Sequence, residues 1–322
     1  MRSNRQQQAN IFIVLVALAA SVGCSTIKED AKPDPSMATS IVGEGTSERA
    51  YQPGDYDTGG WSCPEKTSGS QMVLIPMPDG EPYCIDARPA TYGEYGQFVK
   101  EKGDDFSGQP EKCEHNNDYG PVEYYDRMGC FPLVCGPSLA NANPDWAVGC
   151  LDFCDAWAYC AWAGKRLCGV RGAESGKVMV VDAPDVESVG RAMDELRRSV
   201  RNEWYNVCSQ GGTTKYPYGD TRKAGTCIDN AVIEARGTNA AMIRDTSQSA
   251  CRGTHPPYDR VYHMSGNANA WINICSPSGD CAAPGGPVGK DDSCAGSFGT
   301  FSDLGPGVRC CADAVPGNDH SL

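Results

Sequence analysis

Cysteine content constrains the fold of this chain more than any other feature. The sequence contains 18 cysteines, and all of them except Cys24 lie between residues 63 and 311. In an exported protein such a density indicates disulfides rather than zinc sites, and no C-x-x-C pair is present. Each disulfide contributes roughly 2–5 kcal/mol to the stability of a small secreted domain. We therefore predict a disulfide-rich fold, with one cysteine unpaired or joined to another chain if Cys24 carries a lipid.

The N-terminal residues predict export. Residues 1–23 have a basic start and an apolar run at 11–20 that is shorter than the roughly 20 residues needed to span a bilayer, as in a signal peptide. The following S-V-G-C resembles a bacterial lipobox, which implies that Cys24 is diacylated and anchors the protein to a membrane. An ordinary secreted protein with a free Cys24 is the alternative. Ser25 after the cysteine resembles the sorting signal for the outer membrane of a Gram-negative bacterium.

Composition and charge divide the rest of the chain and limit its partners. Residues 24–62 are rich in small and polar residues, so we expect a flexible tether there. The folded domain is expected over residues 63–313, followed by a tail at 314–322. With a net charge of −13 and no basic patch, the chain is not expected to bind nucleic acid. The four histidines are scattered and have no metal-ligand spacing.

Several segments with distinct local patterns follow one another along the chain. In the first segment, two strands lead into a helix that begins near Thr91, with Glu94 placed to complete a capping box. In the second, apolar residues at helical spacing are followed by Gly164, which can end the helix. The segments are MVLIPMPDGEPYCIDARPATYGEYGQFV (72–99), LDFCDAWAYCAWAGKRL (151–167), NEWYNVCSQGGTTKYPYGD (202–220), VYHMSGNANAW (261–271), Gly285-Gly286 and GPGVRCCAD (305–313).

In this order, these segments resemble the formylglycine-generating enzyme family, also called the sulfatase-modifying factor family, in its cysteine-rich bacterial lipoprotein version. The resemblance covers about residues 70–313. It implies an irregular, duplicated α+β fold related to C-type lectins, with little regular secondary structure. The 37 Gly and 22 Pro independently favour long loops. The resemblance also makes the Gly266-Asn267 turn a structural element of the core, whereas a surface hairpin turn is the alternative.

The catalytic and metal-binding positions of this family are only partly present. Catalytic members bind copper through two thiolates shortly after the Gly-Gly pair, but here Cys294 is the only cysteine between that pair and Cys310. The His-rich iron motif of other members is absent from the sequence, so neither copper nor iron is expected. One calcium site of the family carries over to Asn230, Ala231 and Asp245, an oxygen-only set that suits calcium. Asn230 as an ordinary turn residue is the alternative.

A second calcium site of the family falls on His263 and Ala270. Neither residue matches the carboxylate or amide ligand that the family has there. We therefore do not expect calcium at this second position.

Two disulfides are implied by the resemblance, and four more are guessed from proximity in sequence. The family pairings carry over to Cys160–Cys310 and Cys208–Cys294. The alternative for Cys294 is a free thiol whose partner in space is another cysteine such as Cys311. The guesses from proximity are Cys63–Cys84, Cys154–Cys168, Cys227–Cys251 and Cys275–Cys281.

An insert of about 35 residues separates Leu167 from Asn202, where the family has a short link. Apolar residues at helical spacing predict an amphipathic helix over about 184–200 that packs on the domain. A helix that binds a partner is the alternative.

The sequence therefore favours an exported, lipid-anchored domain without catalytic activity. Such a domain would bind an unknown glycan, peptide or envelope protein, or serve as a structural part of the cell surface. The alternatives are a formylglycine-generating oxidase or another oxidoreductase on the same fold, and a subunit of a larger surface assembly.

Overall fold

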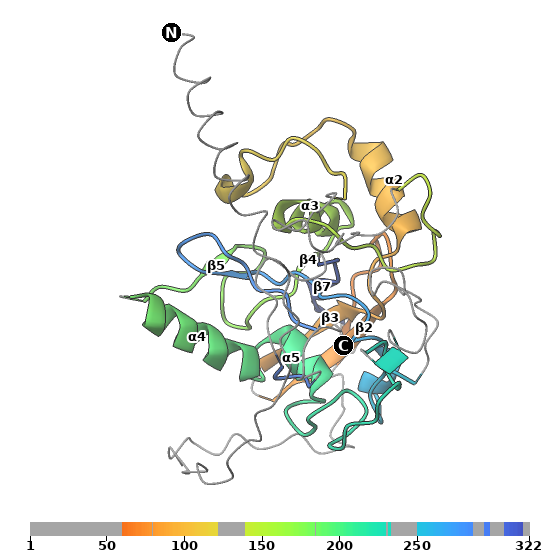
Figure 1. Ribbon diagram of the computed structural model, residues 1–322, viewed down its shortest axis with the longest axis vertical. Helices are drawn as coiled ribbons and strands as arrows, with labels where there is room; N and C mark the ends of the chain where they lie inside the picture. Colours follow the sequence, from red (N-terminus) through yellow and green to blue (C-terminus); the bar gives the residue numbers. More distant parts are fainter. Residues whose placement is uncertain are drawn as a thin grey trace, which may run out of the picture. The chain divides into compact units, whose positions relative to one another are not determined.

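A four-stranded antiparallel sheet brings distant parts of the chain together (Figure 1). Strands β2 (Met72–Met77) and β3 (Gly80–Asp86) form the predicted hairpin, β7 (Cys310–Asp313) pairs with β3, and β4 (Arg166–Leu167) pairs with β7. Three segments that are far apart in the sequence therefore share one sheet. The computed structural model describes residues 60–78, 80–121, 139–183, 185–229, 231–232, 250–285, 293–296 and 306–317. All of these belong to one compact unit, residues 47–127 and 132–322, whereas the other unit, residues 1–46 and 128–131, lies outside them.

Apolar side chains cover both faces of this sheet. Because successive side chains of a strand point to opposite faces, the apolar run of β2 supplies both. One face carries Val73 and Ile75 and packs against Trp204 and Tyr258. The other face carries Leu74, which packs with Cys84, Ala312 and Trp61.

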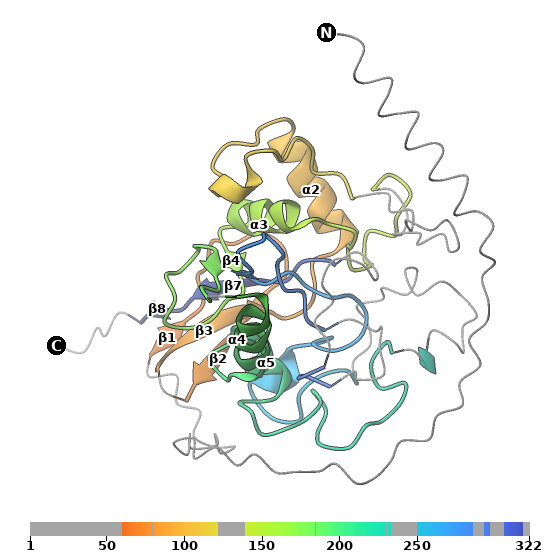
Figure 2. The ribbon, with the colours of Figure 1, turned by 60° about the vertical axis from the view of Figure 1, so that its left-hand side comes forward.

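A second pair of strands moves the boundaries of the folded domain outward. Strand β1 (Trp61–Ser62) pairs with β8 (Val315–Pro316) at the edge seen in Figure 2. The expected limits of 63 and 313 were therefore too narrow at both ends. The indole of Trp61 packs against the sheet, and this burial of apolar surface draws the last residues of the expected tether into the fold.

Helices α2 (Tyr92–Lys102) and α3 (Phe153–Trp162) lie side by side over one part of the core. Thr91 and Glu94 form the predicted capping box of α2, and Asp152 and Asp155 form the equivalent box of α3. Buried aromatic rings of the two helices contact each other. Between α2 and α3 in the chain lies the 3₁₀ helix η1 (Glu111–Cys113), whose Cys113 belongs to the same core cluster. The interacting rings include Tyr95, Phe98 and Tyr159, with centroid distances of 5.2–5.7 Å.

The insert forms α4 (Val186–Arg198), as predicted for about 184–200. Asp185 caps its N-terminus, and Met193 and Leu196 pack against the core that also contains α5 (Glu203–Cys208). Strand β5 (Met179–Val180) before the helix pairs in parallel with β6 (Ile274–Cys275). Among the described residues, a further short helix is η3 (Tyr258–Arg260). Helix α4 therefore packs on the domain, as the sequence predicts.

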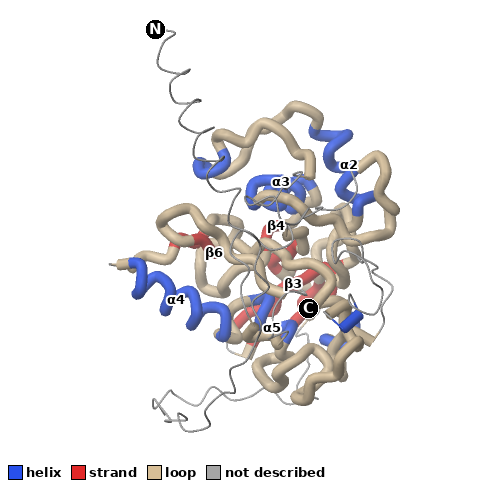
Figure 3. The backbone as a smooth tube through the Cα atoms, viewed as in Figure 1, coloured by secondary structure: helices blue, strands red, loops and turns tan. Residues whose placement is uncertain are grey.

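The fold class agrees with the sequence prediction. Figure 3 shows that loops connect few and short helices and strands in the described part of the chain. The structure is therefore α+β with little regular secondary structure, as expected from its glycine and proline content.

Seven disulfides join described cysteines, and five of them agree with the expected pairs. These are Cys63–Cys84, Cys160–Cys310, Cys208–Cys294, Cys227–Cys251 and Cys275–Cys281. Their Cα–Cα distances lie between 3.9 and 5.7 Å. Cys150 is also disulfide-bonded, so each cysteine of the described residues has a partner. Cys24, Cys130 and Cys135 lie outside the described residues.

The expected pair Cys154–Cys168 was wrong. Cys154 bonds instead to Cys113, and Cys168 bonds to Cys311. Cys154 lies in the first turn of α3, whereas Cys168 follows β4, which pairs with β7. The sheet therefore brings Cys168 to Cys311, a contact that proximity in sequence could not indicate. The alternative pairing of Cys294 with Cys311 is also excluded, because Cys311 bonds to Cys168 and Cys294 bonds to Cys208.

The Gly266-Asn267 turn is part of the core rather than a surface hairpin. Both residues are buried and have positive φ angles of 73° and 62°. The backbone N–H of Asn267 donates to Ile228 O at 2.9 Å, and a Cβ at Gly266 would lie 2.5 Å from the same oxygen. The end of the segment is fixed by Trp271, whose Nε1 donates to Leu151 O at 2.8 Å.

We predict that Gly266→Ala destabilises the protein by roughly 2–4 kcal/mol, because the new methyl group meets a buried carbonyl. Gly108→Ala is the matched control: its φ is 79°, and a Cβ there meets nothing within 4 Å. The control carries only the cost of a left-handed backbone, about 1 kcal/mol. Urea unfolding of the oxidised proteins measures both values, and equal losses of stability would contradict a core role for the turn.

Candidate functional site

A cavity of about 310 Å³ lies beside the sheet, where the insert begins. Its wall is the loop of residues 169–177, and its floor comes from β4, the first residue of α5 and the last residue of β7. The lining residues are Glu81, Arg166, Leu167, Gly169, Val170, Arg171, Gly172, Ala173, Glu174, Ser175, Gly176, Lys177, Met179, Glu203, Asn273 and Asp313.

Glycine allows the 169–177 loop to turn tightly. Gly172 and Gly176 have φ angles of 88° and 75°, in the left-handed region that side chains rarely adopt. A Cβ at Gly172 would meet the guanidinium of Arg201, so the loop passes close to that residue. Backbone hydrogen bonds from Arg171 to Arg201 O and from Lys177 to Glu174 O complete the turns.

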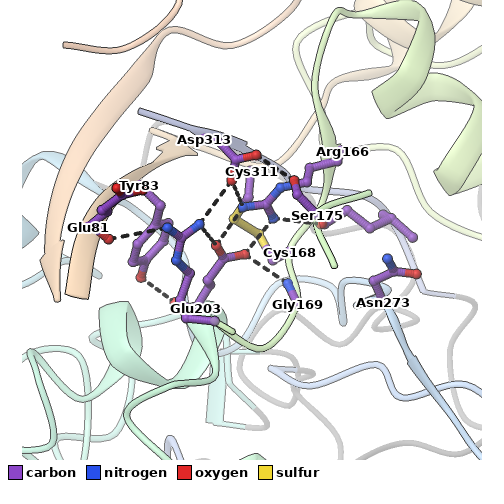
Figure 4. A network of polar contacts seen from close by, with 12 residues as sticks. Glu81, Tyr83, Arg166, Cys168, Gly169, Ser175, Glu203, Asn273, Cys311 and Asp313 are labelled. Carbon is purple, nitrogen blue, oxygen red and sulfur yellow. Dashed lines mark hydrogen bonds and ion pairs between the residues drawn. A yellow bond between two sulfur atoms is a disulfide. The ribbon is translucent and has the colours of Figure 1, made fainter. Parts of the chain in front are cut away.

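An ion pair between Arg166 and Glu203 forms the floor (Figure 4). The two guanidinium nitrogens Nη1 and Nη2 donate to the two carboxylate oxygens, each at 2.7 Å. Glu203 is 1% exposed at its side chain and also accepts from the Gly169 amide at 2.9 Å. Such a bidentate pair holds both side chains in a defined orientation in addition to the energy of the ion pair.

Asp313 extends this network toward solvent. It accepts from Arg166 Nη2 at 2.8 Å, from Arg171 Nη1 at 2.9 Å and from the Ser175 hydroxyl. Burial alone would raise the pKa of Asp313, but the bonds from Ser175 and Arg166 and the charge of Arg171 lower it below its usual value. Two arginines thus face two carboxylates, so this network carries no net charge at neutral pH.

Two polar atoms beside the cavity have no hydrogen-bond partner. Asn273 Oδ1 and Arg166 Nε are buried and unpaired, although the Asn273 amide nitrogen donates to Lys177 O. An unpaired buried group costs about 1–3 kcal/mol. Both residues line the cavity, but these two atoms are shielded from solvent, so the groups that a ligand meets there are the exposed parts of Arg171 and Asp313.

The nearby cysteines do not form a metal site in the oxidised protein. In the described part of the chain, ligand atoms of Cys168, Glu203 and Cys311 lie within 4.8 Å of one another. However, the two sulfurs are bonded to each other, and Glu203 is held by Arg166 (Figure 4). A disulfide sulfur is not a thiolate ligand. The disulfide instead fixes the start of the 169–177 loop against β7.

The position of the family's copper site does not fit copper. Cys294, the one cysteine of that segment, is bonded to Cys208. The two residues at the family's second calcium site, His263 and Ala270, have roles in the backbone and in packing. His263 is buried with a φ of 58°, and Ala270 forms a parallel bridge with Gly307.

The other predicted site residues lie mostly outside the described residues. This applies to Cys24, Asn230 and Asp245. Ala231 is half-buried and helical. The first calcium site therefore stays a prediction.

The cavity itself was missed by the sequence interpretation. Arg166 and Glu203 were seen only as members of longer segments, and the insert was considered only for its helix. A usable signal was present, because Gly169, Gly172 and Gly176 are interspersed with charged residues in the first part of the insert. Such spacing predicts a tight polar loop.

The crystal structure of CarF is similar with 14% sequence identity and a TM-score of 0.37, over 77% of this chain and 96% of that chain. A comparison with curated proteins found no match. Residues 64–287 match the family described as "Sulfatase-modifying factor enzyme 1-like domain". Because this match spans more than half of the chain, the protein belongs to the sulfatase-modifying factor family, that of the formylglycine-generating enzyme.

Proposed function

We propose that this protein is an exported, lipid-anchored member of its family that binds a ligand and does not oxidise cysteine. The disulfide between Cys208 and Cys294 carries the proposal, because it occupies the only sulfur available where the family places two copper-binding thiolates. The active alternative, an oxidase on the same fold, needs a pair of free thiols at that place.

The cavity beside the 169–177 loop is the proposed ligand site, and a glycan is the ligand class that it suits best. Its volume of about 310 Å³ is at the lower end of small-molecule pockets. The charges of Arg166 and Arg171 balance those of Glu203 and Asp313, so this network favours neither an anion nor a cation. One sugar hydroxyl can donate to the Asp313 carboxylate, whose side chain is 49% exposed, and another can accept from Arg171, whose side chain is 21% exposed. A peptide or an envelope protein is the competing ligand.

The lipid at Cys24 is proposed to hold the protein on the outer membrane of a Gram-negative bacterium. The lipobox-like sequence and the polar tether support this proposal. Among the residues that the structure describes, no helix has the length and apolarity required to cross a bilayer. Calcium at Asn230, Ala231 and Asp245 is part of the same proposal, without copper or iron.

We predict that the intact protein, supplied with Cu(I) and a Cys-x-Pro-x-Arg peptide, forms no aldehyde. Mass spectrometry of the peptide measures this result. Aldehyde that is lost in Cys294→Ser, but kept in Cys251→Ser, would show that the oxidase alternative is right. Cys251→Ser is the matched control because it also breaks one disulfide, the one with Cys227.

We predict that a labelled fatty acid enters the protein during expression in a Gram-negative host and is absent from Cys24→Ala. Ser25→Ala keeps the acceptor cysteine and should retain the label. In-gel detection of the label measures the outcome. Label that persists in Cys24→Ala means that the proposed anchor is wrong.

We predict that Ala173→Trp abolishes binding to immobilised oligosaccharides of the bacterial cell envelope, with at least a tenfold loss of affinity. Ala173 is exposed at the rim of the cavity, so an indole there fills the cavity without entering the core. Ala161→Trp on the exposed side of α3 is the matched control and should bind as the unmodified protein does. Equal binding by both variants, or no oligosaccharide bound at all, contradicts the glycan proposal.

A further inference from the structure

An exposed lysine contacts the disulfide between Cys275 and Cys281. Lys112, on the short helix η1, places its Nζ against both sulfurs of this bridge, Cys281 Sγ and, at 3.3 Å, Cys275 Sγ. The same ammonium donates to Gly279 O at 3.0 Å and lies 4.3 Å from the centre of the Phe153 ring. A carbonyl and an aromatic face thus hold the cation above the two sulfurs.

The ammonium distinguishes this bridge from the other disulfides, because Cys281 Sγ also lies 3.6 Å from a backbone carbonyl, Gly279 O. In the described ranges, hydrogen-bonding contacts of other disulfide sulfurs are to backbone carbonyls: Cys168 Sγ lies 3.8 Å from Arg309 O, and Cys251 Sγ lies 3.3 Å from Ser265 O. A carbonyl disfavours a negative charge on sulfur, whereas an ammonium stabilises a thiolate. A sulfur with a stabilised thiolate is also the better leaving group in thiol–disulfide exchange.

The same disulfide is the one that the fold needs least. Its cysteines are 6 residues apart, whereas the separations of the other described bridges run from 21 to 150. In the chain-entropy account, a shorter loop constrains the unfolded chain less and therefore stabilises the fold less. Reduction of this bridge should cost less stability than reduction of the others.

The turn between the two cysteines has hydrogen bonds that do not depend on the disulfide. Ser276 N donates to Asp280 O at 2.7 Å, Gly279 N donates to Ser276 O at 3.0 Å, and the Ser278 hydroxyl donates to Asp280 at 2.9 Å. Pro277, Ser278 and Gly279 are exposed, as is Lys112. Both cysteines are buried beneath them, 1% and 2% exposed, so a dithiol reaches the sulfurs when Lys112 and this exposed turn move aside. The hydrogen bonds of the turn keep the two thiols near each other afterwards.

We propose that Cys275–Cys281 is a redox-active disulfide that exchanges with a dithiol reductant, and that Lys112 stabilises the leaving thiolate. One donor thiolate attacks Cys275 Sγ, the bond to Cys281 breaks, and its electron pair stays on Cys281 Sγ beside the Lys112 ammonium. The second donor thiolate then attacks its partner sulfur in the mixed disulfide and releases Cys275. Two electrons and two protons pass from the dithiol to the protein, and the donor leaves as a disulfide.

The test is a redox titration of the intact oxidised protein with dithiothreitol, which is the dithiol probe. Free thiols are trapped with iodoacetamide, and peptide mass spectrometry gives the reduced fraction of each bridge. We expect Cys275–Cys281 to be reduced first, at a dithiothreitol concentration that leaves Cys227–Cys251 oxidised. Simultaneous reduction of these two bridges, or later reduction of Cys275–Cys281, overturns the proposal.

The role of Lys112 is tested with three variants in the same titration. Lys112→Met should raise the concentration needed for half-reduction of Cys275–Cys281 about threefold, the effect of losing one exposed charge contact. Lys112→Arg keeps the charge and should stay within about twofold of the unmodified protein, and Lys100→Met, an exposed lysine on α2, should change nothing. An unchanged midpoint in Lys112→Met, or an equal shift in Lys112→Arg, contradicts the electrostatic role.

Discussion

The fold depends on one buried carboxylate, that of Asp86. It accepts from Lys165 Nζ at 2.6 Å and from the Cys310 amide at 2.9 Å, and both side chains of the ion pair are 1% exposed. Burial raises the pKa of Asp86, although the nearby charge of Lys165 opposes this effect. Burial also lowers the pKa of Arg309, a neighbouring cation, to about 9. Removing one partner of such a pair leaves a buried charge and costs roughly 3–5 kcal/mol. The end of β3, the residue before β4 and the start of β7 therefore meet at a single point.

The cavity is built on this rigid junction rather than on the positions that catalytic members of the family use. Arg166 directly follows Lys165 in the sequence, so the ion pair that fixes β4 also fixes the guanidinium that binds Glu203. Cys168–Cys311 then fixes the start of the 169–177 loop two residues later. A site whose supporting residues are immobile keeps its geometry without a bound ligand. The proposed binding site therefore uses the frame of the fold and not the catalytic positions of the family.

The sequence allowed prediction where one local pattern or one family segment decided the outcome. The capping box at Thr91, the helix of the insert and Cys160–Cys310 are examples. Prediction failed where three-dimensional neighbours decided it. Cys154 and Cys168 are close in sequence, but α3 and β4 direct them to different partners. The cavity was missed for the same reason, since Arg166, Glu203 and Asp313 become neighbours only through the sheet and α5.

The disulfides have two physical roles that follow from the lengths of their loops. Cys160–Cys310 and Cys168–Cys311 lie beside the Asp86 junction and close loops of 150 and 143 residues. Because these loops are long, the two bridges reduce the conformational entropy of the unfolded chain strongly. Once these bridges and the buried ion pair hold the sheet, the loops around it no longer need to contribute much stability. Short bridges such as Cys275–Cys281 and polar loops such as 169–177 can therefore have contacts that suit exchange or binding rather than folding. A domain with few regular elements can carry such sites because its stability is concentrated at one crosslinked junction.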